Sequence, residues 1–353
     1  MEPSDLHEPE GSEPGSRTGL TPLTRGALWA SLVLIFAAAA FCGWLALYAY
    51  TPGPVAGEKH AVVMIPRGSS VEEIAGLLGD SGLIANDVRF MLLSRIMKAS
   101  ARLPAGEFEL TTGNTPVELI SELVDAEPLQ HRITIAEGLT VHQIADLFSA
   151  DGWVDRERFV ERASDPAFIA ELGLQGTSLE GYLFPDTYQL VRPTPGESAL
   201  IRLLVKRALA VWDDLENRPA EEPGLTRHEV FTLASIVEKE TGKADERPLI
   251  ASVFLNRLKR NMKLQSDPTV IYGIPDYQGP LTRTDLKTRT PYNTYQIPGL
   301  PPGPICSPGR EALAAVLNPA ESSYLYFVSK NDGSHQFSKS LREHNRAVRK
   351  YQR

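Results

Sequence analysis

Cysteine is scarce in this chain, which has 353 residues and only Cys42 and Cys306. Cys42 lies inside a long apolar run and Cys306 lies far along the chain, so we do not expect them to pair. A domain without a disulfide framework must be held together by its hydrophobic core. The length allows this, because 353 residues are enough for two or three domains.

Metal-binding patterns are also missing from the sequence. The 7 histidines are scattered, without His-x-His, His-Glu-x-x-His or Cys-x-x-Cys spacing, which argues against a metal site. The net charge is −8 and no large basic block offsets it, which argues against a nucleic-acid partner. The charged and apolar fractions, 23% and 42%, are those of a folded globular protein.

One long run lacks charge altogether, from Ala27 to Tyr50. A helix of about 20 apolar residues crosses a bilayer, and Trp and Tyr near both ends of this run suit the membrane interfaces. We therefore predict a transmembrane helix at 25–50, with residues 1–24 as a disordered cytoplasmic tail and the rest of the chain outside the cytoplasm. Residues 51–60 are expected to form a linker. The alternatives are a cleavable signal peptide, which is usually shorter and more N-terminal, and a buried core helix, which rarely lacks every charge.

An internal repeat follows the apolar run. The stretch Ile65–Val71 recurs as Ile135–Val141, and the same offset still holds between Gly82 and Gly152. Each copy is typical of a strand, a glycine turn and a short capped helix. The layout resembles LysM-like modules of cell-wall proteins, so we expect one or more LysM-like α+β modules at 61–160. A structural spacer without a ligand is the alternative.

A well-signalled helix carries two acidic residues. Thr226 and Glu229 form a capping-box pattern, and Gly242 is a plausible stop, so we predict a helix at about 227–241. Glu238 and Glu240 both fall at the margins of its apolar face, where burial tends to raise a carboxyl pKa and to make a general acid. The alternative is that they pair with arginines such as Arg247 or Arg257. Helix spacing does not choose between the two glutamates.

Further motifs follow in a fixed order, and together with this helix they resemble the YceG-like (MltG) family of endolytic murein transglycosylases. They cover roughly residues 60–353, and are Leu179–Tyr188, Leu233–Thr241, Ala251–Leu258, Leu264–Gly273, Pro291–Tyr295, Gly299–Pro304, Asn318-Pro319 and Tyr324–Val328. The resemblance implies an α+β protein with one N-terminal transmembrane helix, LysM-like modules and a lysozyme-like catalytic domain at 161–353. It also implies a single-pass protein of the bacterial inner membrane that acts on nascent peptidoglycan strands beside glycan-polymerising enzymes.

The resemblance implies a reaction as well. The bond between N-acetylmuramic acid and N-acetylglucosamine is cut without water, leaving a 1,6-anhydro end, and no cofactor is needed. The catalytic acid is the first glutamate of Ile-Val-Glu-Lys-Glu, which is Glu238 here, and Glu240 becomes a substrate-contacting residue or, alternatively, the acid itself. The expected groove residues are Asn256, Gln265, Asp267, Thr269, Tyr272, Tyr292, Asn293, Thr294 and Tyr295, with structural packing as the alternative for each. Two rival functions remain: a muramidase that pairs Glu238 with a carboxylate such as Asp267, and a non-catalytic wall-binding scaffold.

Overall fold

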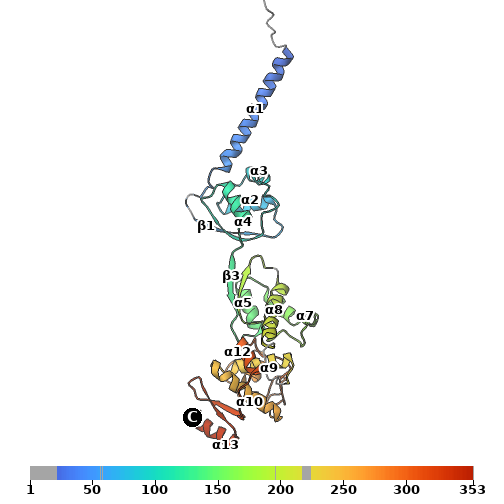
Figure 1. Ribbon diagram of the computed structural model, residues 1–353, viewed down its shortest axis with the longest axis vertical. Coiled ribbons are helices and arrows are strands. Elements are labelled where there is room, and N and C mark those ends of the chain that lie inside the picture. The colour runs from blue at the N-terminus through green and yellow to red at the C-terminus, as the bar shows by residue number, and fades with distance from the viewer. Residues whose placement is uncertain (1–21, 56, 58, 195, 217–223, 353) are drawn as a thin grey trace, which may run out of the picture. The chain divides into compact units, whose positions relative to one another are not determined.

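The computed structural model describes residues 22–352, apart from 56, 58, 195 and 217–223 (Figure 1). The chain divides into two compact units, one ending at Leu129 and the other beginning at Gln130. Both contain helices and strands, so the expected α+β class is confirmed. Residues 1–21 of the expected cytoplasmic tail lie outside the described residues.

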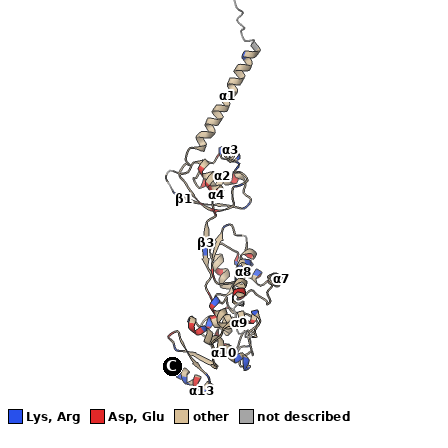
Figure 2. Ribbon diagram, in the orientation of Figure 1, with Lys and Arg blue, Asp and Glu red and all other residues tan. Residues whose placement is uncertain are grey.

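The predicted apolar helix is present as α1, Pro22–Ala49. Its 28 residues make it about 42 Å long, which exceeds the hydrocarbon thickness of a bilayer. Figure 2 shows α1 almost free of charged residues, in keeping with the uncharged sequence that follows Arg25. Among the described residues it is the one helix long and apolar enough to span a membrane.

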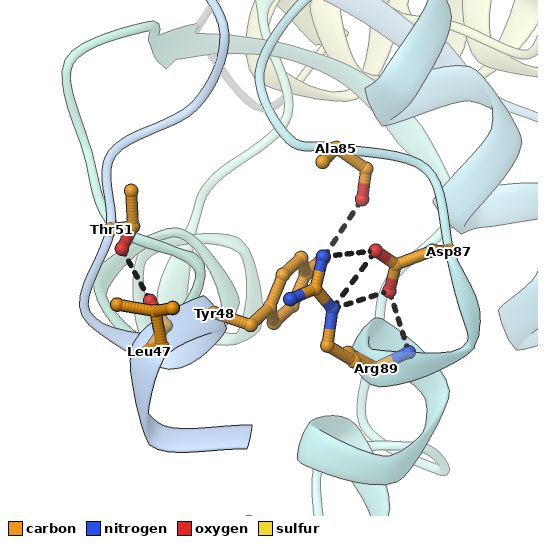
Figure 3. A network of polar contacts seen from close by, with 6 residues as sticks. All are labelled: Leu47, Tyr48, Thr51, Ala85, Asp87 and Arg89. Atoms are coloured by element: carbon orange, nitrogen blue, oxygen red, sulfur yellow. Dashed lines mark hydrogen bonds and ion pairs between the residues drawn. The ribbon is translucent and has the colours of Figure 1, made fainter. Parts of the chain in front are cut away.

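The last turn of α1 belongs to the first unit. Tyr48 is buried there, and its hydroxyl donates a hydrogen bond to the carbonyl of Ala85 at 3.1 Å (Figure 3). The guanidinium of Arg89 lies 4.6 Å from the centre of the Tyr48 ring and forms an ion pair with Asp87 at 2.5 Å. Asp87 also caps the next helix by accepting from the backbone N–H of Arg89. The fully exposed part of α1 therefore ends about one turn before the helix does.

The first unit packs three helices with a two-stranded sheet. Strand β1 (His60–Ile65) pairs antiparallel with β2 (Gly106–Thr111), with Val63 opposite Phe108. The helices are α2 (Val71–Asp80), α3 (Val88–Ile96) and α4 (Pro116–Asp125). Ser70 and Thr115 cap α2 and α4 through complete capping boxes. Phe90, Phe108 and Leu119 are fully buried at the centre of this unit.

The second unit begins with the second copy of the repeat. Strand β3 (Gln130–Thr134) pairs antiparallel with β4 (Thr187–Val191), and α5 (Val141–Ala150), α6 (Arg156–Ala163) and α7 (Pro166–Glu171) lie between them in sequence. One hydrophobic core runs from Ile133 to Leu317. The repeat copies therefore lie in different units, and the division at residue 129 differs from the expected one at 160. The reason is that β3 finds its partner strand, β4, beyond residue 160.

The remaining elements include one largely buried helix, α9 (Arg227–Glu240), which packs against α10, α11 and α12. The predicted helix at 227–241 is confirmed, with its Thr226 capping box, and ends where Thr241 becomes extended. The other elements are α8 (Glu197–Glu216), two 3₁₀ turns (Ala244–Glu246 and Asp285–Lys287), α10 (Arg247–Lys259), α11 (Asp267–Tyr272), α12 (Arg310–Leu317), β5 (Tyr326–Ser329), β6 (His335–Ser338) and α13 (Leu341–Tyr351). Strands β5 and β6 form an antiparallel hairpin. Since Val230 to Val237 are all buried, α9 brings polar groups toward the surface only at its two ends.

Candidate functional site

Glu238, the acid that the resemblance implies, is held in an ion pair. Its Oε1 lies 3.2 Å from the guanidinium of Arg247, and its Oε2 accepts the backbone N–H of Gly309 at 2.9 Å. Both side chains are nearly buried, with 7% of Glu238 and 10% of Arg247 exposed. This is the alternative that the sequence left open for the two glutamates. Such a carboxylate has both oxygens engaged by donors to its charged form.

A second carboxylate joins this ion pair. Glu137 accepts from the same Arg247 nitrogen at 3.5 Å and stays 45% exposed. Burial, followed by the nearby charge of Glu238, raises the pKa of Glu137. A Cβ atom at position 309 would lie 1.8 Å from Oε1 of Glu137, so the close approach depends on glycine there. Together these contacts fasten the turn after β3 to the end of α9 and the start of α12.

The sequence analysis did not single out Glu137, although the repeat contained a signal. The equivalent position in the first copy is Arg67, so the two copies carry opposite charges at the same place in the turn. In the second unit the acidic residue faces Arg247. A charge reversal at one position of a repeat indicates that one copy has acquired a partner of its own.

Glu240 is in a different environment. Its Oε1 accepts a hydrogen bond from the hydroxyl of Ser266 at 2.6 Å, and no ion pair is recorded for it among the described residues. Burial raises the pKa of Glu240 to about 7, although Ser266 and the more distant charge of Arg257 act to lower it. The negative charge of Asp267 adds to the rise. A carboxyl group with this pKa is substantially protonated near neutral pH and can donate a proton.

Glu240 also lines an open pocket of about 460 Å³. Three of the expected groove residues, Gln265, Asp267 and Tyr295, line the same pocket. The Tyr295 hydroxyl donates to Asp267 at 2.6 Å, which fixes the two side chains relative to each other. The opposite wall comes from β5, β6 and α13 and was not anticipated; it includes Tyr326, Phe327, His335, Leu341 and His344. The pocket therefore combines one protonatable carboxyl group with hydrogen-bonding groups and aromatic rings.

The comparisons with known proteins agree with the resemblance. The sequence pattern of the YceG-like family matches residues 63–350. The chain belongs to this family. An endolytic murein transglycosylase of Bacillus subtilis is 33% identical over 304 residues, which cover 82% of this chain and 84% of that protein. One of Streptococcus pneumoniae is 32% identical over 330 residues, covering 82% of this chain and 58% of that protein. A yceG-like protein of Listeria monocytogenes, solved by crystallography, is 32% identical, with a TM-score of 0.55 over 82% of this chain and 100% of that one.

Four expected groove residues in this YceG-like chain support the fold instead of facing the pocket. Thr269, Asn293 and Thr294 have no exposed surface. Asn293 donates to three backbone carbonyls of the preceding turn, and Thr269 and Thr294 hydrogen-bond each other at 2.8 Å. Asn256 donates to the carbonyls of Ser322 and Tyr324. Buried polar side chains need such partners, so these contacts favour the structural alternative for the four residues, and their contact with glycan stays a prediction.

Tyr272 and Tyr292 form a separate pair. Their rings contact edge to face, with centres 4.7 Å apart, and neither ring lines the pocket that contains Glu240. The Tyr272 hydroxyl donates to Glu180 at 3.2 Å, and burial raises the pKa of Glu180 to about 7. Glu180 also accepts the backbone N–H of Val141 at the start of α5. Contact between these two tyrosines and a glycan stays a prediction.

The residues described here contain no group of three or more His, Cys, Asp or Glu side chains arranged to hold a metal ion. Glu137 and Glu238 are two carboxylates close together, but Arg247 occupies the space between them as their cation. At the pocket, the carboxyl group of Glu240 is placed for acid–base chemistry.

Proposed function

We propose that this chain is a membrane-anchored endolytic murein transglycosylase. It cuts the bond between N-acetylmuramic acid and N-acetylglucosamine in nascent glycan strands and leaves 1,6-anhydro ends. Membership in the YceG-like family and relatives of that name support this function. The observation that carries it is the pocket, in which a carboxyl group with a pKa of about 7 faces hydrogen-bonding and aromatic side chains.

Glu240, not Glu238, is the acid in this proposal. A general acid needs its proton near the working pH and an open path to the substrate, and Glu240 has both. Glu238 is not the proton donor in this scheme, because both of its oxygens are already held by a guanidinium and a backbone N–H. Glu238 instead holds the end of α9 in place. The resemblance alone pointed to Glu238, and the geometry around both carboxylates is the reason for moving the role by two residues.

One carboxyl group is sufficient for this reaction. Glu240 protonates the glycosidic oxygen while the bond from that oxygen to the sugar C1 breaks and an oxocarbenium-like centre develops. The carboxylate then takes the proton from the 6-hydroxyl of the same sugar as its oxygen bonds to C1. The proton returns to Glu240, no water is consumed, and no cofactor takes part. Gln265, Asp267 and Tyr295 hold the sugar rings in this scheme.

A muramidase is the second candidate, because Asp267 lines the same pocket as Glu240. A hydrolase needs a second carboxylate to activate water or to attack the sugar directly. Asp267 already accepts a hydrogen bond from Tyr295 and is exposed, as such a residue has to be. The products distinguish the two reactions, since only the transglycosylase leaves anhydro ends.

The remaining parts of the proposal concern location and partners. We place α1 in the bacterial inner membrane with the N-terminus inside, because Arg17 and Arg25 precede the apolar run. The strand–helix–helix–strand order of the first unit, with its strands paired antiparallel, supports a LysM-like module there. The packing around α9 supports a lysozyme-like catalytic unit. A tethered enzyme of this kind acts close to the membrane, where peptidoglycan synthases are its proposed partners.

The test is a product analysis with the full chain in detergent and uncrosslinked glycan strands. Mass spectrometry compares the wild type with Glu240→Gln and Glu238→Gln. Anhydro-ended internal fragments that disappear in the Glu240 variant support both the reaction and the acid. Products that carry an added water support the muramidase. Loss of products in a folded Glu238 variant, with the Glu240 variant still active, returns the acid to Glu238.

A further inference from the structure

Ser266 lies directly behind the proposed acid. Its hydroxyl donates to Oε1 of Glu240 at 2.6 Å, and this is the one hydrogen bond recorded for that hydroxyl among the described residues. The residue is only 2% exposed, so substrate does not reach it. A buried hydroxyl that serves a single carboxylate oxygen is suited to position that carboxylate.

A rigid network holds Ser266 in place. Its backbone N–H donates to the Thr294 hydroxyl at 3.0 Å, and its carbonyl accepts the Thr269 hydroxyl at 2.7 Å. The two threonine hydroxyls are themselves 2.8 Å apart. This network explains why Thr269 and Thr294 are buried in the fold. They fix the backbone of Ser266 and leave its side chain free to contact Glu240.

We propose that Ser266 is the positioning residue for Glu240, an inference that rests on the proposed function. By donating to Oε1, the hydroxyl locks the carboxyl rotamer and leaves the dissociable proton on Oε2. Oε2 then gives its proton to the glycosidic oxygen and later takes the proton of the 6-hydroxyl, so the atom that donates is also the atom that is restored. Through both steps Ser266 keeps its own proton and its bond to Oε1.

The same hydrogen bond sets how strongly Glu240 holds its proton. A donor to the charged form lowers a carboxyl pKa, so loss of the hydroxyl raises it further. Hydrogen bonds to charged groups are strong enough to move a pKa by about one pH unit. The other charged or titratable groups at this pocket are Asp267 on α11, Arg257 on α10, His335 on β6 and His344 on α13, with Tyr295 and Tyr326. None of them changes in a Ser266 variant, so the shift isolates the hydroxyl.

The experiment measures kcat/KM against pH for the full chain in detergent, with Ser266→Ala, Ser266→Thr and a control. The control is Ser252→Ala, which removes another buried hydroxyl whose partners are the Leu249 carbonyl and Ser322. Ser266→Ala is expected to lower the plateau by about tenfold and to move the alkaline limb up by about one pH unit. Ser266→Thr, which keeps the hydroxyl, restores both, and the Ser252 variant changes neither.

Each outcome bears on the inference. The inference is overturned if Ser266→Ala lowers activity but leaves the alkaline limb of the pH profile in place. That result indicates a purely structural defect, which does not change the pKa of Glu240. Unchanged activity and profile overturn it as well. If Ser266→Ala does not fold, Ser266→Cys decides on the same criteria, with a smaller shift because a thiol donates weakly. Glu240→Gln, measured in parallel, distinguishes the proposed acid from the proposed role of Ser266. An active Glu240→Gln variant rules out Glu240 as the acid. An inactive Glu240→Gln variant, together with an unchanged pH profile of Ser266→Ala, rules out only the role of Ser266.

Discussion

Replacing Glu240 by glutamine is expected to make the protein more stable while it abolishes activity. The carboxyl pKa is raised from 4.5 to about 7 in the folded state by burial. Between these two values the folded protein holds a proton that the unfolded chain has lost, so stability falls as pH rises through this window. At about 1.4 kcal/mol per pH unit, the full cost above pH 7 is about 3 kcal/mol. Glutamine carries no such cost, and its amide oxygen still accepts the hydrogen bond from Ser266.

Thermal unfolding of the full chain in detergent, followed by circular dichroism, checks this reasoning. At pH 8 the Glu240→Gln variant is expected to melt about 6 to 12 °C above the wild type, given the size of the second unit. At pH 4 the difference is expected to vanish, because both states then hold the proton. Glu238→Gln is the matched control, and at pH 8 it is expected to lower the melting temperature. It breaks a buried ion pair, which lowers the free energy of unfolding by about 3 kcal/mol, and by less if Glu137 remains as a partner for Arg247. Two results contradict this reasoning: a Glu240→Gln variant that melts at or below the wild type at pH 8, or a difference in melting temperature that does not change with pH. Either result means that burial does not raise the pKa of Glu240 in the folded protein.

Two further predictions concern the neighbours of the glutamates. Gly309→Ala is expected to push the Glu137 side chain away from Arg247 and to lower the free energy of unfolding by about 1 kcal/mol, seen as a melting temperature lower by a few degrees. The control is Gly242→Ala, because an added Cβ at that position meets nothing within 4 Å. Equal effects at the two positions contradict the prediction. Tyr295→Phe removes the 2.6 Å hydrogen bond to Asp267, and in steady-state assays it is expected to raise KM about fivefold while kcat stays within twofold of the wild type. A fall in kcat at constant KM contradicts a role of Tyr295 in holding the substrate.

Helix signals in the sequence were the most informative about the fold. The capping box at Thr226 and the apolar face located α9 almost to the residue, and the uncharged run located α1. Both depend on interactions within a few residues, which a sequence displays directly. The division between the units was not predictable in this way, because the repeat suggested LysM-like modules within 61–160, whereas the partner strand of β3 lies at Thr187–Val191. Pairing between strands that lie far apart in the chain is not signalled by the residues next to either strand.

Helix spacing could not choose between the two glutamates for a related reason. Helix geometry placed Glu238 and Glu240 at equivalent margins of one apolar face, and nothing within α9 distinguishes them. Their different environments come from Arg247 and Gly309 on one side and from Ser266 on the other, all brought in from outside the helix. Sequence reasoning found the pair, and only tertiary contacts could rank its members. The wall formed by β5, β6 and α13 was missed because its residues approach Glu240 only in the folded chain.

The two glutamates act as a unit because of where α9 ends. Positions two apart on a helix point about 200° from each other, so one carboxylate can be anchored while the other faces the pocket. The end of a helix is where fraying would move a catalytic group, and at this end Glu238 is fastened through Arg247 and Gly309 to two other segments. The hydrogen bond from the Ser266 hydroxyl then fixes the side-chain rotamer of Glu240. In the proposed function, the burial that raises the pKa of Glu240 to about 7 keeps a proton on this carboxyl group near neutral pH.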